Sequence, residues 1–511
     1  NRMSRRLALT ILLVVVAGSI ALRVHPLTSR SIWFDEAFTW RITLFPVAEI
    51  ISRTAADVHP PLYYLLLKAW TWVFGSSLLG LRSLSVAFAG VAVASAYLFA
   101  ASSWRSRETG ILAAAFTAVS AWQIPFAWDA RMYTLVPALV LLSSWLLLRS
   151  CRLSLGRNPS ARPLLSWAAY SVLAAMLVYV HNFGFLTLAA QMLFVVGMLF
   201  VRTRARLYEV VREPLARHAA LAFLAAALMY LPWLPTLVQQ VQRLQGNFWV
   251  PEFSATTAIT TFYHFAAPTL EPVAKGWAYF ALMLTLLAFL WLVVGESRSH
   301  AAAYFVATLT VVPIAFIIVI SVMGQSLYHD RFLIFAHIFF GVALAALLTR
   351  FRSRGLAWTL GLCVLVLSLS AALAYQQELE IARRPGLQAA VVSLANQLQP
   401  EEKLYVSSPF IFLPAVFHAG HRAVPLPPLK LIADPKALPH YAGVAALVPD
   451  DVASWESVVA SEDHSLWVID TTGFGATPLV LPPPWERTRE EKYQEVFPHQ
   501  GEVMVSQWQR E

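Results

Sequence analysis

The sequence contains few charged residues. Only 13% of its 511 residues are Asp, Glu, Lys or Arg, and 58% are hydrophobic, whereas about 25% of the residues in a soluble globular protein are charged. This deficit excludes a soluble globular protein, because a water-facing surface of this size needs more charge. The hydrophobic residues come in runs of about 18–22, and a helix needs roughly 20 to cross a bilayer. Lipid offers no partner for backbone N–H and C=O groups, so these runs must be helical.

Cysteine is also scarce. Cys151 falls in a basic loop and Cys363 inside an apolar run, so the two form neither a metal-binding pattern nor a disulfide framework. The net charge of +9 would suit a nucleic-acid partner. However, most Arg residues lie in short loops between apolar runs, which is typical of the cytoplasmic loops of membrane proteins. We therefore expect membrane lipids, and no nucleic acid, among the partners.

Eleven apolar runs predict an α-helical polytopic membrane protein. The first follows Arg5 and Arg6, as the apolar core of a signal peptide would, but no small-residue cleavage site comes after it. We therefore expect it to be retained as a span. The predicted spans cover about 7–24, 77–101, 110–127, 132–149, 165–181, 183–201, 218–236, 276–295, 301–322, 331–349 and 356–375.

Lys and Arg are distributed unevenly between alternate loops. The densely basic set contains Arg2, Arg5, Arg6, Arg105, Arg107, Arg149, Arg152, Arg157, Arg162, Arg202, Arg204, Arg206, Arg212, Arg217, Arg298, Arg350, Arg352 and Arg354. The longer opposite set contains only Arg30, Arg41, Arg53, Lys68, Arg131, Arg243, Lys275 and Arg331. Because cytoplasmic loops carry the excess of positive charge, we predict a cytoplasmic N-terminus in the plasma (bacterial inner) membrane. An odd number of spans then places the C-terminus outside.

The composition changes at about residue 376. The pattern predicts a helix at 388–398, strands at 403–407 and 466–469, and hence a small extracytoplasmic α/β domain, 376–511. The transmembrane domain before it, 1–375, includes a long first outer loop, 25–76. In that loop 45–53 and 60–74 predict short amphipathic helices, which we expect at the membrane surface.

Two polar segments of the first outer loop could carry chemistry. Segment 31–37 has the sequence SIWFDEA and places Asp35 and Glu36 beside aromatic residues, where burial suits a carboxylate to base catalysis. The alternative is an acidic pair solvated at the membrane surface. Segment 57–64, DVHPPLYY, places His59 before a helix start and Tyr63 within that helix. Its alternative role is to cap the helix N-terminus.

Three further clusters are predicted at the same face. Segment 128–133, WDARMY, is a tight outer turn in which an acid and a base two residues apart could simply pair. Segment 328–331, YHDR, ends with an Arg that either snorkels to the surface or binds a lipid phosphate. His181 ends the fifth span, where a lone His is more often a local hydrogen-bonding group. Together these residues indicate a site for a phosphate-bearing lipid and a nucleophile.

At these segments the chain resembles the GT-C glycosyltransferases, in the branch that contains protein O-mannosyltransferases and the aminoarabinose transferase of lipid A. The shared pattern is WFDEA at 33–37, HPPLYY at 59–64, ARMY at 130–133 and RFL at 331–333. The resemblance covers roughly residues 1–375. It implies a polyprenyl-phosphate-linked sugar as donor, an acceptor hydroxyl on a lipid, glycan or protein, and a reaction at the extracytoplasmic face.

The resemblance also assigns roles to residues. Asp35 is implied as the catalytic carboxylate, with Glu36 beside it, and Arg131 and Arg331 match positions near the donor phosphate. Asp129 stands where relatives often have Glu, and Phe332 stands where Tyr is frequent. The full substrate-binding prediction is His59, Tyr63, Asp129, Arg131, Tyr133, His181, Tyr328, Asp330 and Arg331.

Three questions remain open at this point. No cofactor is predicted, although Asp35, Glu36 and Asp129 could hold a divalent metal. A transporter or flippase of lipid-linked sugars would favour ionisable groups near the bilayer midplane and internal repeats, whereas the acids here lie at one face and no repeat is found. A noncatalytic membrane subunit that reuses the scaffold would lack its acids, and Asp35 is present.

Overall fold

The computed structural model describes residues 3–156, 162–244, 249–266, 272–295, 300–380, 384–399, 401–422 and 426–510. Of the basic loop residues, Arg2, Arg157 and Arg298 lie outside the described residues. The chain forms two compact units. The first consists of Asn1–His25, His59–Tyr63 and Ser83–Tyr375, and the second of Pro26–Val58, Tyr64–Arg82 and Gln376–Glu511. The first outer loop therefore belongs mostly to the same unit as the C-terminal domain.

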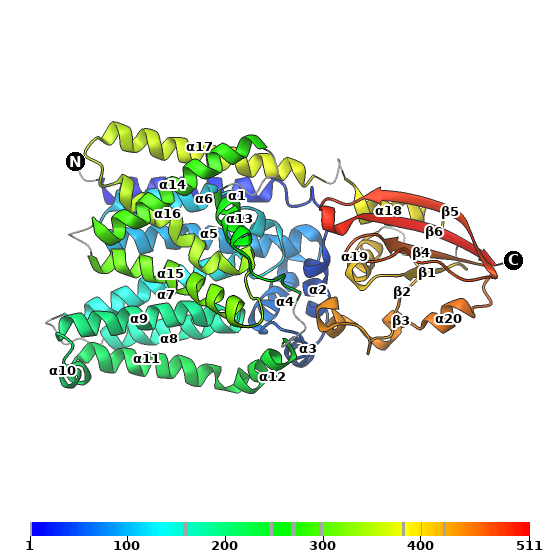
Figure 1. Ribbon diagram of the computed structural model, residues 1–511, viewed down its shortest axis with the longest axis horizontal. Helices are drawn as coiled ribbons and strands as arrows, with labels where there is room; N and C mark the ends of the chain where they lie inside the picture. The colour runs from blue at the N-terminus through cyan, green and yellow to red at the C-terminus, as the bar shows by residue number, and fades with distance from the viewer. Residues whose placement is uncertain are drawn as a thin grey trace. The chain divides into compact units, whose positions relative to one another are not determined.

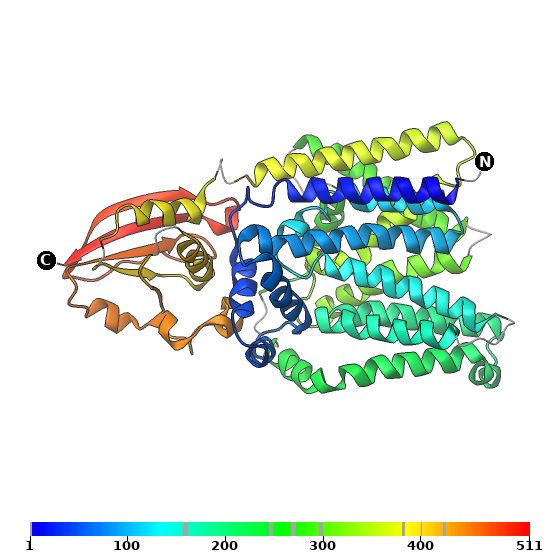
Figure 2. The same ribbon diagram turned by 180° about the vertical axis from the view of Figure 1, so that it is seen from behind.

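The first unit is a bundle of long apolar helices that run side by side (Figures 1 and 2). Its long helices are α1 (Arg5–Val24), α5 (Leu78–Trp104), α7 (Leu135–Ser154), α8 (Arg162–Val180), α9 (Gly184–Arg202), α11 (Pro214–Tyr230), α14 (Pro272–Val294), α15 (His300–Met323), α16 (Ile334–Leu348) and α17 (Arg354–Glu378). Among the described residues, nine helices are long and apolar enough to cross a membrane. The prediction of a multi-pass membrane protein is confirmed.

Short elements connect the long helices. They are α6 (Arg107–Val119), η1 (Pro125–Trp128), α10 (Leu207–Arg212), η2 (Leu231–Trp233), α12 (Leu234–Leu244), α13 (Ala255–Ala266) and η3 (Asp330–Leu333). The predicted span 110–127 is one of these, since α6 ends at Val119. There Ser120 Oγ accepts the N–H of Gln123 at 3.3 Å, and the guanidinium of buried Arg23 donates to the Ala118 carbonyl at 2.7 Å. Because the last carbonyls of a helix lack partners within it, Arg23 caps α6.

The second unit contains a six-stranded mixed sheet. Its strands are β1 (Lys403–Val406), β2 (Leu429–Ile432), β3 (Val452–Ala453), β4 (Ser465–Thr471), β5 (Trp485–Gln494) and β6 (Glu502–Arg510). Their order is β3-β2-β1-β4-β6-β5. Strands β1 to β4 are mutually parallel, and β6 is antiparallel to both β4 and β5. Strands β1 and β4 are almost wholly buried, as central parallel strands are. The prediction of a small α/β domain is confirmed.

Helices cover this sheet and connect its strands (Figure 1). Helices α18 (Gly386–Ala395) and α19 (Pro409–Gly420) pack on one another and on the strands, and α20 (Trp455–Val459) precedes β4. Three short 3₁₀ turns lie between β2 and β3, η4 (His440–Ala442), η5 (Val444–Ala446) and η6 (Pro449–Asp451), and η7 (Pro498–Gln500) lies between β5 and β6.

The first outer loop contributes three helices, α2 (Phe34–Thr43), α3 (Val47–Ala56) and α4 (Leu62–Phe74). Helix α2 packs against α19 within the second unit: the ring centroids of Phe34 and Phe410 are 5.3 Å apart, and those of Trp40 and Phe417 are 5.1 Å apart. Helices α3 and α4 coincide with the two predicted amphipathic segments. Trp72 on α4 is 85% exposed, which suits the surface position expected for it.

Candidate active site

The two adjacent acids of α2 lie in different environments. Asp35 is partly buried in the first turn, and the partial positive charge of a helix N-terminus favours a carboxylate there. Its backbone carbonyl accepts from Thr39 Oγ1 at 2.8 Å. Glu36 is fully buried, and both of its carboxylate oxygens accept from Arg82, at 2.8 Å from Nε and 2.7 Å from Nη2. Only Asp35 is therefore partly accessible to a substrate.

Arg82 is fully buried and ties this loop together. Besides Glu36, it donates to the carbonyls of Leu27 at 2.6 Å, Arg30 at 2.9 Å and Ser31 at 3.0 Å. A buried charge is tolerated when it is paired and its remaining donors are satisfied. The sequence analysis missed Arg82, although a lone Arg inside a predicted span, 77–101, is by itself a signal of a functional or buried partner.

A histidine–arginine pair lies at the centre of the candidate residues in the first unit. Arg131 is 3% exposed, and its Nη2 lies 3.2 Å from Nε2 of His59. A guanidinium can only donate, so Nε2 of His59 accepts this hydrogen bond. His59 thus orients the Arg131 guanidinium.

Hydrogen bonds to its backbone fix the turn that carries Arg131. The N–H of Arg131 donates to the Asp129 carbonyl at 2.8 Å, and the hydroxyl of Ser85 donates to the same carbonyl at 2.7 Å. The hydroxyl of fully buried Tyr63 lies 3.3 Å from Ser85 Oγ. Tyr63 and Ser85, the latter missed by the sequence analysis, therefore fix the backbone of the turn.

His181 lies between α8 and α9 beside this pair. Its ring centroid is 6.2 Å from that of His59 and 6.4 Å from that of Tyr133. The backbone N–H of Phe183 donates to its Nδ1 at 3.2 Å, which places the proton of the neutral ring on Nε2. Burial lowers the pKa of His181 well below its ordinary value, and the neighbouring charge of Arg131 acts in the same direction. In this tautomer Nε2 of His181 can donate a hydrogen bond to a ligand.

Arg331 is placed by the segment that precedes α16. Its guanidinium carbon lies 4.6 Å from the centroid of the Trp249 ring, a cation–π contact. The Asp330 carboxylate lies 3.2 Å from His264 Nδ1 and 2.7 Å from His329 Nδ1. Asp330 therefore contacts two histidines. One of them, His264, was not among the predicted site residues.

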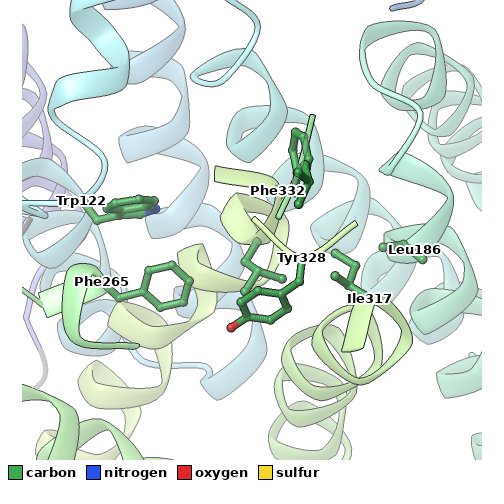
Figure 3. Packing of buried hydrophobic residues seen from close by; sticks show 8 residues of the cluster. Trp122, Leu186, Phe265, Ile317, Tyr328 and Phe332 are labelled. Carbon is green, nitrogen blue, oxygen red and sulfur yellow. The ribbon is translucent and has the colours of Figure 1, made fainter. Parts of the chain in front are cut away.

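Apolar packing fixes the two neighbours of this charged segment. Tyr328 is 2% exposed and Phe332 is 8% exposed, and both belong to one cluster of buried side chains with Trp122 and Phe265. Figure 3 shows the Tyr328 and Phe332 rings among these residues. Tyr328 packs within this cluster, and its contact with a substrate stays a prediction.

The first unit thus brings together most of the predicted binding residues. His59, Arg131, His181 and Tyr133 are linked by the contacts above, and the charge of Arg331 acts on His181. Guanidinium groups and ring N–H groups are donors that suit an anion such as a phosphate. Asp35 and Glu36 belong to the second unit. In the part of the chain that the structure describes, no group of three or more His, Cys, Asp or Glu residues could hold a metal ion.

We expect His418 of α19 to make the free energy of unfolding of the second unit depend on pH. Burial lowers its pKa from 6.5 to about 3, and the charges of His421 and Arg82 act in the same direction. Between these pKa values the unfolded chain binds a proton that the folded chain does not, so the free energy of unfolding rises with pH over this window. We expect denaturant unfolding to give a shallower pH slope there for His418→Gln. An unchanged slope would exclude His418 as the source.

The comparisons with known proteins are based on structure. No protein-family model and no curated protein matches the sequence. The crystal structure of ArnT from Cupriavidus metallidurans bound to undecaprenyl phosphate has a TM-score of 0.61 at 14% identity, with 97% of each chain covered. The same protein in the apo state has a TM-score of 0.63 at the same identity and coverage.

A second group of similar structures is archaeal. The Archaeoglobus fulgidus oligosaccharyltransferase tethered with an acceptor peptide containing the NVT sequon has a TM-score of 0.57 at 13% identity. The alignment covers 81% of this chain and 63% of that one. At such identities the likeness establishes a shared fold.

Proposed function

The chain has the GT-C fold of membrane glycosyltransferases, and from this premise we propose that it transfers a sugar from a polyprenyl-phosphate-linked donor to an acceptor hydroxyl. The observation that carries the proposal is the pairing of a buried guanidinium, Arg131, with His59. The centroid of the neighbouring His181 ring lies 6.2 Å from that of His59 and 6.1 Å from that of Phe332, the residue after Arg331. Such a cluster suits the phosphate of a lipid-linked donor. The similar ArnT structure contains undecaprenyl phosphate, which supports the same class of ligand here.

In the proposed reaction the acceptor oxygen attacks the anomeric carbon as Asp35 takes its proton. The bond between that carbon and the phosphate oxygen breaks, and its electron pair leaves with the polyprenyl phosphate, which inverts the configuration. The leaving group is a stable anion and needs no general acid. Arg331 and Arg131 stabilise its developing charge, and positioning of the reactants contributes up to about 7–11 kcal/mol.

The remaining residues support these roles. His59 orients Arg131, and the protonated Nε2 of His181 can donate to a donor oxygen. Glu36, held by Arg82, anchors the loop that carries Asp35. Helix α5 carries Arg82 and, three residues later, Ser85, which holds the 129–131 turn.

The test is release of polyprenyl phosphate from a panel of polyprenyl-phosphate sugars by the purified protein, with and without EDTA. Delipidated membranes, lipid extracts and polysaccharide serve as separate acceptor sources. Release that depends on one donor, with sugar appearing in one acceptor fraction, supports the transferase and names both substrates. Binding of no donor by any measure would contradict it and favour a noncatalytic subunit.

The proposed orientation can be tested independently. In a Cys363→Ser background, where the remaining Cys151 is buried, one new cysteine replaces either Arg204, in the basic loop before α10, or Lys436, in the C-terminal domain. Both positions are exposed. We expect a membrane-impermeant maleimide to label Lys436→Cys in right-side-out vesicles and Arg204→Cys only in inside-out vesicles, because basic loops face the cytoplasm. The opposite labelling pattern would show that the predicted topology is reversed and that the loop carrying Asp35 faces the cytoplasm.

A further inference from the structure

The first outer loop, which carries Asp35 and is called the acid loop below, is attached to the C-terminal domain by a largely buried ion pair. Nη2 of Arg41, in the last turn of α2, donates to both oxygens of Asp451, at 3.1 and 3.0 Å. The two side chains are only 19% and 14% exposed, so solvent screens the pair less than a surface pair. Asp451 Oδ2 also accepts the N–H of Val448 at 2.9 Å, so its own turn fixes the carboxylate.

A second arginine of the loop holds the same short segment. Arg53 of α3 donates through Nη1 to the carbonyls of Ala445 at 2.8 Å and Leu447 at 3.1 Å. Its guanidinium carbon lies 3.6 Å from the centroid of the Phe45 ring, between α2 and α3. The two arginines therefore bind residues 443–451, which we call the loop seat.

The N-terminal end of α2 is fixed on the same domain. Ser31 Oγ lies 2.9 Å from His418 Nε2, and the Phe34 ring contacts Phe410 edge-on. Gly443 of the loop seat has a φ of +77°, and a Cβ there would come within 3.1 Å of Phe34 Cζ. A glycine thus allows Phe34 to approach. Asp35 lies between Phe34 and Arg41, so C-terminal residues hold the chain on both sides of it.

We infer that the C-terminal domain positions the Asp35 carboxylate for the proposed transfer, with Arg41 and Asp451 as positioning residues that act through α2. This inference rests on the proposed function for its catalytic part alone. Attachment of the acid loop to residues 443–451 can be measured without any turnover. Because a misplacement of about 1 Å can cost roughly 100-fold in rate, loosening α2 should lower kcat and leave donor binding unchanged.

The central variant is Asp451→Asn, which keeps the shape of the side chain and removes its charge. We expect kcat to fall by about tenfold to 100-fold, with an unchanged KM for the donor and an unchanged pH profile, since the base is still Asp35. The double exchange Arg41→Asp with Asp451→Arg should recover part of the rate that either single exchange loses. Glu490→Gln is the matched control, because Glu490 pairs with Arg487 on β5 and should leave kcat unchanged.

Hydrogen exchange of peptides covering 31–45 gives the second readout, in detergent and without substrate. Asp451→Asn should speed exchange there and leave β1 and β4 protected, which shows that the domain is folded. Unchanged exchange at 31–45 would overturn the attachment. Faster exchange with unchanged kcat would overturn the positioning role. If the wild-type protein transfers no sugar from any donor, faster exchange still supports the attachment, and it is the proposed function that fails.

Discussion

Asp35→Asn is expected to remove almost all sugar transfer while the protein stays folded and keeps its donor affinity. The substitution retains the size of the side chain and its place in the first turn of α2 but removes the group that accepts the proton. A positioned general base contributes about 100-fold to 10,000-fold to a rate, so kcat should fall by that factor. The measurement is polyprenyl phosphate release, with donor binding determined in parallel.

Two further variants separate the loss of the base from a displaced base and from weaker donor binding. Asp35→Glu keeps a base but moves it by one methylene, and it should retain more activity than Asp35→Asn. Donor binding should be weakened by Arg331→Ala instead, because that residue is proposed to hold the phosphate. Turnover of Asp35→Asn within a few-fold of wild type would remove Asp35 as the base and leave another acid, or the acceptor itself, to supply the function.

The largest expected loss of stability comes from the buried pair of Glu36 and Arg82. Removing one partner of a buried ion pair leaves an uncompensated charge and costs about 3–5 kcal/mol. Arg82→Met should be worse than Glu36→Gln, because Arg82 also satisfies the carbonyls of Leu27, Arg30 and Ser31. The free energy of unfolding, or the Tm at one fixed scan rate, measures this in detergent.

The control for this experiment is an exposed pair. Arg206 and Glu209 form an i,i+3 ion pair in which the side chains are 70% and 47% exposed. Exposed pairs contribute about 0–1 kcal/mol, so Glu209→Gln should scarcely change stability. If Glu36→Gln is equally mild, the buried carboxylate carries no net stabilisation, and its position next to Asp35 needs another explanation.

Much of the membrane unit can be predicted from the sequence, because long apolar runs have one stable form in lipid. The end of α6 could not be predicted, because it depends on Arg23, a residue nearly 100 positions away, donating to the carbonyl of Ala118. A run of apolar residues predicts a helix, but it does not indicate which distant side chain will cap that helix.

The candidate site was predictable in its residues and less so in their separate roles. Asp35 and Glu36 are adjacent and chemically alike, and only the distant Arg82 distinguishes them by binding the second. Whether Asp35 is the base stays a prediction. In the C-terminal domain, β1 and β4 are apolar enough to be predicted. Strand β5 is mostly polar and exposed and is defined by its pairing with β6.

The grouping of 26–58, 64–82 and 376–511 in one unit limits how this protein can exchange parts with its relatives. The C-terminal domain looks like a detachable module in the linear sequence, yet a chimera that replaces 376–511 alone would cut through a shared core. The arginines of α2 and α3 would then face a foreign surface. Productive recombination must carry the first outer loop together with the C-terminal domain, so the two segments should diverge in concert between homologues.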